Sequence, residues 1–127
     1  MSVKSYRIHT HTSGRGFTAF NFDNIPFPED FHVKEKTCFY FPPDDYGGNH
    51  SHPRTEAFIA IGDMEITWEE NGEIHTEHMF TDDVPKLYII PPHVPHIVRN
   101  LSVSQFGILL EYADGPQTEV KKANFPV

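Results

Sequence analysis

The sequence predicts an all-β fold, a barrel or sandwich of about nine or ten short strands. Three observations lead to this prediction. Short runs that are apolar, or that alternate between apolar and polar residues, recur along the chain between turn signals. The 127 residues include eleven prolines and eight glycines, which indicates many turns. No stretch shows helical periodicity over a useful length.

The strand signals of the first half are broken by glycine and proline. Residues 3–9 alternate weakly, and residues 17–22 alternate around phenylalanines after a turn whose two glycines permit positive φ. A loop with two prolines follows, and residues 31–36 are expected to form a short strand. The β-branched and aromatic run at 37–41 predicts a strand, which ends in a loop over residues 42–48.

The middle of the chain is more regular. Residues 56–61 are almost wholly apolar, which is typical of a strand buried on both faces. Residues 64–70 alternate between apolar and polar, and residues 73–80 form the return strand of a hairpin. The turn between them is Asn71-Gly72, the strongest short hairpin signal, because both residues accept positive φ.

The remaining strands are predicted at 86–90, 95–100 and 105–112, with a loop at 82–85. The polar tail from residue 113 is expected to be loosely ordered. At this length the whole chain, 1–127, is expected to be a single domain.

Composition excludes several classes of partner. The formal net charge of −8 argues against nucleic acid and anionic membranes, because both are polyanions. No run approaches the roughly 18 apolar residues of a membrane span, and no signal peptide is apparent, so a cytoplasmic location is expected. The single cysteine, Cys38, excludes an intrachain disulfide and is expected to be a small buried side chain.

The candidate functional residues begin with His50, His52 and Glu56. On an extended strand the two histidines project to the same face, about 7 Å apart, and Glu56 has the same parity. Two imidazoles and a carboxylate suit a divalent metal. His96, which follows a proline-rich turn, is the candidate fourth ligand.

These two stretches resemble the two motifs of the cupin superfamily. His50, His52 and Glu56 match the spacing of the first, G-x5-H-x-H-x3,4-E-x6-G, and Pro91, His96 and Asn100 match G-x5-P-x-G-x2-H-x3-N. The resemblance covers roughly residues 37–112. It implies a double-stranded β-helix, the jelly-roll barrel, holding one divalent transition metal (Fe, Mn, Co, Ni, Zn or Cu) on His50, His52, Glu56 and His96. A metal-free polar interior is the alternative.

The match departs from the motifs at turn positions. Asp44 stands in place of the leading glycine, and Gly62 comes one residue early. Pro85 and His93 replace the two glycines of the second motif. His93 suits its position only if that turn does not require positive φ.

Three functions follow from the resemblance. The first is a metal-dependent enzyme on a small molecule, with dioxygenase or isomerase chemistry. The second is a metal-independent sugar-nucleotide ketoisomerase in which His52 is the general base; residues 13–16, 48–52 and 86–92 resemble such cupins, although Pro95 replaces their usual tryptophan. The third is a non-catalytic cupin that binds a small ligand.

Four further side chains are candidate substrate contacts, with a surface or core position as the alternative for each: Arg54, Arg99, Tyr40 and Tyr88. A homodimer is also expected, because single-domain cupins commonly pair through sheet edges and a free edge is a liability.

Overall fold

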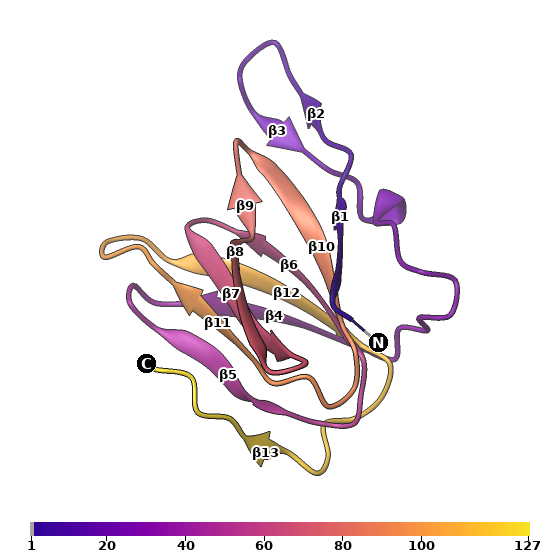
Figure 1. The fold of residues 1–127 in the computed structure, drawn as a ribbon. Helices are drawn as coiled ribbons and strands as arrows, with labels where there is room; N and C mark the ends of the chain where they lie inside the picture. Colours follow the sequence, from indigo (N-terminus) through magenta and orange to yellow (C-terminus); the bar gives the residue numbers. More distant parts are fainter. Residues whose placement is uncertain (1) are drawn as a thin grey trace.

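The computed structural model describes residues 2–127, which form two facing antiparallel sheets and a small hairpin beside them (Figure 1). The first sheet contains β1 (Lys4–Arg7), β10 (Val84–Ile90), β6 (Glu56–Ile61), β12 (Gly107–Ala113) and β4 (Glu35–Phe41) in this order, with β9 (Phe80–Thr81) beside β10. The second contains β13 (Lys121–Lys122), β5 (Tyr46–Ser51), β11 (His96–Asn100), β7 (Met64–Glu70) and β8 (Glu73–His78). The all-β prediction is confirmed.

The main core lies between the two sheets. Met64, Ile66 and Trp68 share one face of β7, as their alternation predicts, and pack against side chains of the opposite sheet such as Phe58 and Leu109. A second apolar cluster covers the outer face of the first sheet, where Phe31 and other residues of the N-terminal segment pack. Most inner positions of the strands are therefore apolar; the exceptions include the candidate ligands, Asn100 and Glu111.

The N-terminal region differs from its prediction. Only Thr18–Ala19 (β3) of the strand expected at 17–22 is paired, with His11–Thr12 (β2), and this hairpin projects beyond the two sheets (Figure 1). Phe22–Asn24 form a 3₁₀ helix (η1), and residues 31–34 precede β4 outside any strand, although the Lys34 N–H donates to the Ala113 carbonyl of β12 at 2.8 Å. Apolar side chains of this N-terminal segment pack on the outer face of the first sheet. The position of the segment therefore depends on this packing more than on backbone pairing. Among residues 2–127 no helix is long and apolar enough to cross a membrane.

Two other expectations are wrong. The tail is not loosely ordered: β13 pairs with β5, Phe125 is buried, and Asn49 exchanges two hydrogen bonds with the backbone of Phe125. Cys38 is exposed rather than buried, because β4 is an edge strand of its sheet. Both errors concern tertiary neighbours that the local sequence does not reveal.

Two of the three substituted glycine positions, Asp44 and His93, adopt the positive φ that favours glycine, and Pro85 does not. Asp44 has φ of 61° and His93 has φ of 69°, so the turn at His93 does adopt positive φ, and histidine occupies it nonetheless. Asp, Asn and His are the non-glycine residues that most often adopt this region. Asn71 and Gly72 also have positive φ, as their hairpin turn predicts.

Asn100 joins the loops at one end of the barrel. Its side-chain amide donates to the carbonyls of Phe41, Pro42 and Gln105 at 2.8–3.1 Å, and its oxygen accepts from the Ser102 N–H. The residue is buried. One side chain therefore satisfies buried backbone groups from two loops.

We expect Asn100→Ala to lower the free energy of unfolding by about 3 kcal/mol, because it leaves several buried carbonyls without a donor. Urea unfolding followed by circular dichroism measures this loss. Asn24→Ala, at an exposed asparagine of η1, is the control and should stay within about 0.5 kcal/mol of wild type. Equal stability of the two variants would contradict this role for Asn100.

Candidate functional site

Four ionisable side chains meet inside the barrel. His50 lies on β5 directly opposite His96 on β11, and His52 follows two residues after His50. Residues 52–55 then carry the chain to the facing sheet, where Glu56 begins β6. One ligand atom from each of the four residues lies within 4.8 Å of the others. Glu56 thus reaches the cluster by a crossover between sheets, not by alternation along one strand.

One oxygen of Glu56 contacts two imidazoles of this cluster. Glu56 Oε1 lies 3.1 Å from His52 Nε2 and 3.1 Å from His96 Nε2. All three atoms are buried, yet none has a hydrogen bond of acceptable geometry among the described residues. Ligands about 2.1 Å from one ion, at right angles, lie about 3.0 Å apart. The residue types and the Glu56–histidine spacings suit the ligands of a single divalent cation.

The protonation of the imidazoles supports the same arrangement. His96 Nδ1 lies 2.9 Å from the Val94 carbonyl, so this nitrogen donates, and Nε2 is the nitrogen directed at the cluster. Burial, followed by the neighbouring charges of His96 and His52, lowers the pKa of His50 to about 4, which leaves its imidazole neutral at pH 7. Burial alone would raise the pKa of Glu56, but its contacts with His52 and His96 lower it.

Arg54 holds the Glu56 carboxylate from the other side. Its Nε and Nη2 donate to Glu56 Oε2 at 2.9 and 2.7 Å, which leaves Oε1 for the histidines. The same Nη2 donates to Glu111 Oε1 at 3.0 Å, and Nη1 contacts Glu35 Oε1 and the Gly115 carbonyl, both at 3.1 Å. The guanidinium is buried, so it serves these groups and does not present a free face to a substrate.

A cavity of about 180 Å³ opens onto the cluster. His50 and His96 lie in its wall with one carboxylate, Glu111, and one amide, Gln117. The rest of the wall is glycine or apolar: Phe39, Phe41, Gly47, Gly48, Phe58, Val98 and Leu109. Gly48 has φ of 89°, and a Cβ there would lie 3.1 Å from the His96 carbonyl, so the close approach of β5 to β11 requires glycine.

The four candidate substrate contacts lie away from this wall. Tyr40 is 71% exposed and alternates with the cavity-lining Phe39 and Phe41, so it faces the opposite side of β4. Arg99 follows the cavity-lining Val98 and likewise faces outward. Tyr88 is buried, and its hydroxyl donates to Glu77 Oε1 at 2.8 Å.

His52, the expected base, is 3% exposed and lies behind the cavity wall.

Sequence reasoning missed the wall residues Phe39, Phe41, Glu111 and Gln117. A signal existed for three of them, since they alternate along predicted strands, but the sequence did not tell which face was inside. Gln117 lies in the tail, where no periodicity identifies it.

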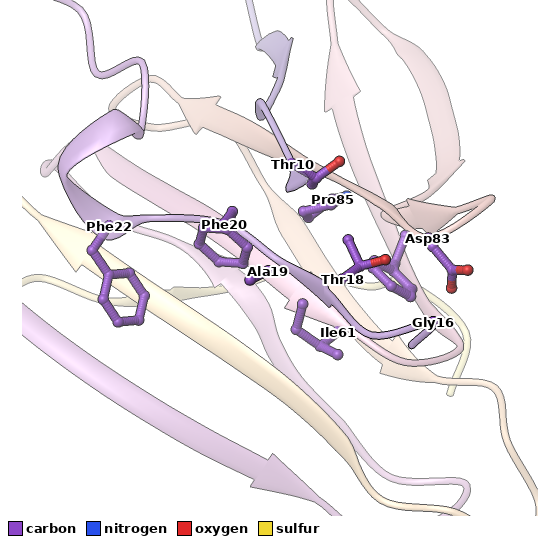
Figure 2. Close-up of a pocket in the computed structure, with 10 residues that line it drawn as sticks. Thr10, Gly16, Thr18, Ala19, Phe20, Phe22, Ile61, Asp83 and Pro85 are labelled. Carbon is purple, nitrogen blue, oxygen red and sulfur yellow. The ribbon is translucent and has the colours of Figure 1, made fainter. Parts of the chain in front are cut away.

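Another hollow, of about 390 Å³, lies where residues 16–20 pass over Ile61 and Pro85 (Figure 2). Asp83 is the one ionisable side chain in its lining. A single carboxylate beside apolar and small polar groups forms neither a metal site nor an acid–base pair. The His/Glu cluster is the candidate functional site because it brings four ligand-type side chains together at a cavity.

We expect Arg54→Met to lower the free energy of unfolding by about 3–5 kcal/mol at pH 7, because it leaves Glu56 and Glu111 buried without their cation. Urea unfolding at pH 7 tests this. Arg7→Met, at an exposed arginine on β1, is the control. A loss below about 1 kcal/mol for Arg54→Met would contradict the inference that the carboxylates depend on this guanidinium.

The comparison with known proteins rests on structure. No protein-family model and no curated protein matches the sequence. The fold matches a dTDP sugar isomerase from Desulfovibrio desulfuricans with a TM-score of 0.76 and 14% identity, over 96% of this chain and 83% of that one. A 3,4-ketoisomerase from Helicobacter canadensis matches with a TM-score of 0.63 and 23% identity, over 94% and 87%.

A third match is a histidine variant of the 3,4-ketoisomerase QdtA from Thermoanaerobacterium thermosaccharolyticum, in complex with TDP-4-keto-6-deoxyglucose. Its TM-score is 0.66 and its identity 17%, over 92% of this chain and 83% of that one. Identities this low establish a shared fold. The resemblance to cupins is thus confirmed at the level of the fold, and this chain has the jelly-roll barrel found in these sugar isomerases.

Proposed function

We propose that this protein is an isomerase of a keto sugar, which moves a proton between the two carbons of a hydroxy-ketone. The observation that carries the proposal is the cavity itself, in which histidines, a carboxylate and one amide meet a wall that is otherwise glycine or apolar. The similar structures named as sugar isomerases, one with a bound keto sugar nucleotide, favour this reaction over the dioxygenase alternative.

The size and polarity of the cavity suit one sugar ring. Its volume of about 180 Å³ is below the roughly 300–1,000 Å³ of pockets for drug-sized ligands, so the nucleotide part of such a substrate would lie outside it. Phe39, Phe41 and Phe58 offer apolar contact to the carbon faces of a ring. An apolar wall also strengthens the electrostatic interactions of the few polar groups.

The reaction needs no net change in atoms or electrons. The proton on the hydroxyl-bearing carbon leaves to a base, its electron pair forms a carbon–carbon double bond, and the carbonyl oxygen gains a proton. The resulting enediol then loses its other hydroxyl proton, and the former carbonyl carbon receives a proton. A group in the cavity wall must therefore accept a proton and return it.

Isomerase activity predicts exchange with solvent. With TDP-4-keto-6-deoxyglucose in D₂O, we expect deuterium beside the carbonyl and a 3-keto isomer, both detected by NMR. His50→Ala/His96→Ala should reduce the exchange rate at least 100-fold, as expected for lost proton transfer and positioning. His93→Asn, at an exposed histidine whose positive φ asparagine also accepts, is the control.

Absence of exchange from TDP-4-keto-6-deoxyglucose and from other keto sugar nucleotides in the wild type would overturn the isomerase proposal. Calorimetry with the same compounds then separates the remaining functions. Binding without exchange would indicate a non-catalytic ligand-binding cupin.

We also propose that His50, His52, Glu56 and His96 hold one divalent transition metal. The support is their ligand type, the position of their donor atoms within 4.8 Å of one another, and the two contacts of 3.1 Å that Glu56 Oε1 makes with His52 and His96. Bound there, the metal would act as a Lewis acid on the carbonyl oxygen and so acidify the neighbouring C–H bond.

The metal proposal predicts about one equivalent of a transition metal in protein purified without a metal column, measured by elemental analysis. His50→Ala/His96→Ala should lose this metal. His9→Ala/His11→Ala, which removes two exposed histidines, should retain it. Removal of metal by a chelator should lower the melting temperature, because a ligand of the folded state stabilises that state.

Two results would contradict the metal proposal. One is a wild type that, after reconstitution, binds no more metal than His50→Ala/His96→Ala. The other is an unchanged melting curve after verified metal removal, which would exclude a role for metal in stability. A metal-free wild type that still exchanges protons would instead be a metal-independent isomerase with a histidine base.

A further inference from the structure

Glu111 is a second carboxylate that faces the cavity. It lies on β12 in the same inward row as Leu109, while Leu110 and Tyr112 point to the outer apolar cluster. Its side chain is 12% exposed. Phe58, its neighbour on β6, lies in the same cavity wall. Glu111 is thus held by a strand in the wall of the cavity.

The hydrogen bonds of Glu111 differ from those of Glu56. Both carboxylates accept from Arg54 Nη2, at 3.0 and 2.7 Å. Glu56 Oε2 also accepts from Arg54 Nε, and its Oε1 faces the histidines. Within residues 2–127, Glu111 makes one side-chain hydrogen bond, through Oε1. Its second oxygen is available to a ligand.

We propose that Glu111 is the catalytic residue that carries the proton between the two carbons of the substrate. This inference rests on the proposed isomerase function and on the metal bound by the histidines. Of the titratable side chains in the cavity wall, His50 and His96 are then occupied as ligands, and Glu111 is the one that is not.

A single base, Glu111, accounts for both proton transfers at carbon. The Glu111 carboxylate accepts the proton from the hydroxyl-bearing carbon as the enediol forms, and the protonated carboxyl returns it to the former carbonyl carbon. The hydroxyl and carbonyl oxygens exchange one proton in the same process. One carboxyl on one face of the ring suffices for both transfers, so no oxidant, reductant or second base is needed.

The surroundings of Glu111 support this role. Burial, followed by the charge of Glu56, raises the pKa of Glu111 to about 7, against the opposing effect of Arg54. A carboxyl that titrates near neutral pH can both accept and release a proton there. The charged and titratable groups around it come from four elements and the loop between β5 and β6: Glu35, His50, His52, Arg54, Glu56 and His96. A bound divalent cation adds positive charge and lowers this pKa.

The test compares Glu111→Gln with Glu35→Gln. Glu35 also contacts Arg54, at 3.1 Å, but its side chain is 46% exposed and lies outside the cavity wall, so it is a matched control. We expect Glu111→Gln to reduce deuterium exchange from TDP-4-keto-6-deoxyglucose at least 100-fold with metal content and substrate affinity retained. Glu35→Gln should stay within about threefold of wild type.

The pH dependence gives a readout that a purely structural role would not change. Glu111 accepts a proton only when ionised, so the wild-type exchange rate should rise with pH as Glu111 ionises. The residual exchange of Glu111→Gln should lack this rise. A titration of ¹³C-labelled glutamate carboxyls, with and without metal, identifies the Glu111 signal by its absence from the variant.

The outcomes separate the inference from the proposed function. Exchange by Glu111→Gln within threefold of wild type would overturn the inference and leave the isomerase proposal standing. No exchange by wild type would overturn both. If Glu111→Gln does not fold, Glu111→Asp is used instead, because it keeps the negative charge. Partial activity that rises with pH as in the wild type would support the inference. Activity equal to that of the wild type without this rise would overturn it.

Discussion

The structure of the site depends on one buried cation, Arg54. Three imidazoles and a carboxylate inside an apolar barrel are costly to bury, and an unpaired carboxylate most of all. Arg54 donates two hydrogen bonds to Glu56 Oε2, so that Glu56 stays ionised and turns its other oxygen toward His52 and His96. The guanidinium is itself buried and surrounded by acceptors. The orientation of the cluster follows from this pairing.

The pairing of strands within the two sheets also positions the side chains of the cluster. Antiparallel pairing sets His50 opposite His96, and the short crossover at 52–55 brings Glu56 from the facing sheet. Three of the four candidate ligands, His50, Glu56 and His96, lie on strands, and positions on regular strands hold ligand atoms more exactly than loops do. The tail adds the Gly115 carbonyl to Arg54 and Gln117 to the cavity wall. Residues far apart in the sequence thus surround a single small volume.

The fold and the function are separate conclusions. Sequence identities of 14–23% with sugar isomerases accompany TM-scores of 0.63–0.76, so the arrangement of strands is shared while most side chains differ. A common fold carries many activities, and the activity depends on the side chains of the site. In this chain these are the His/Glu cluster, an apolar wall rich in phenylalanine, and Glu111, which shares Arg54 with Glu56. The proposed reaction is argued from these groups.

The sequence by itself determined the strands that carry a strong local signal, including β6, the β7–β8 hairpin and β11, because alternation and the Asn71-Gly72 turn are local properties. The motif spacing also identified the four residues that the structure brings together. Only the tertiary structure decided that the tail is ordered, that Cys38 is exposed, and that Arg54 binds carboxylates. It alone placed Glu111 in the cavity. These features depend on which strands are neighbours and which face is inside, and both arise from contacts between residues distant in sequence.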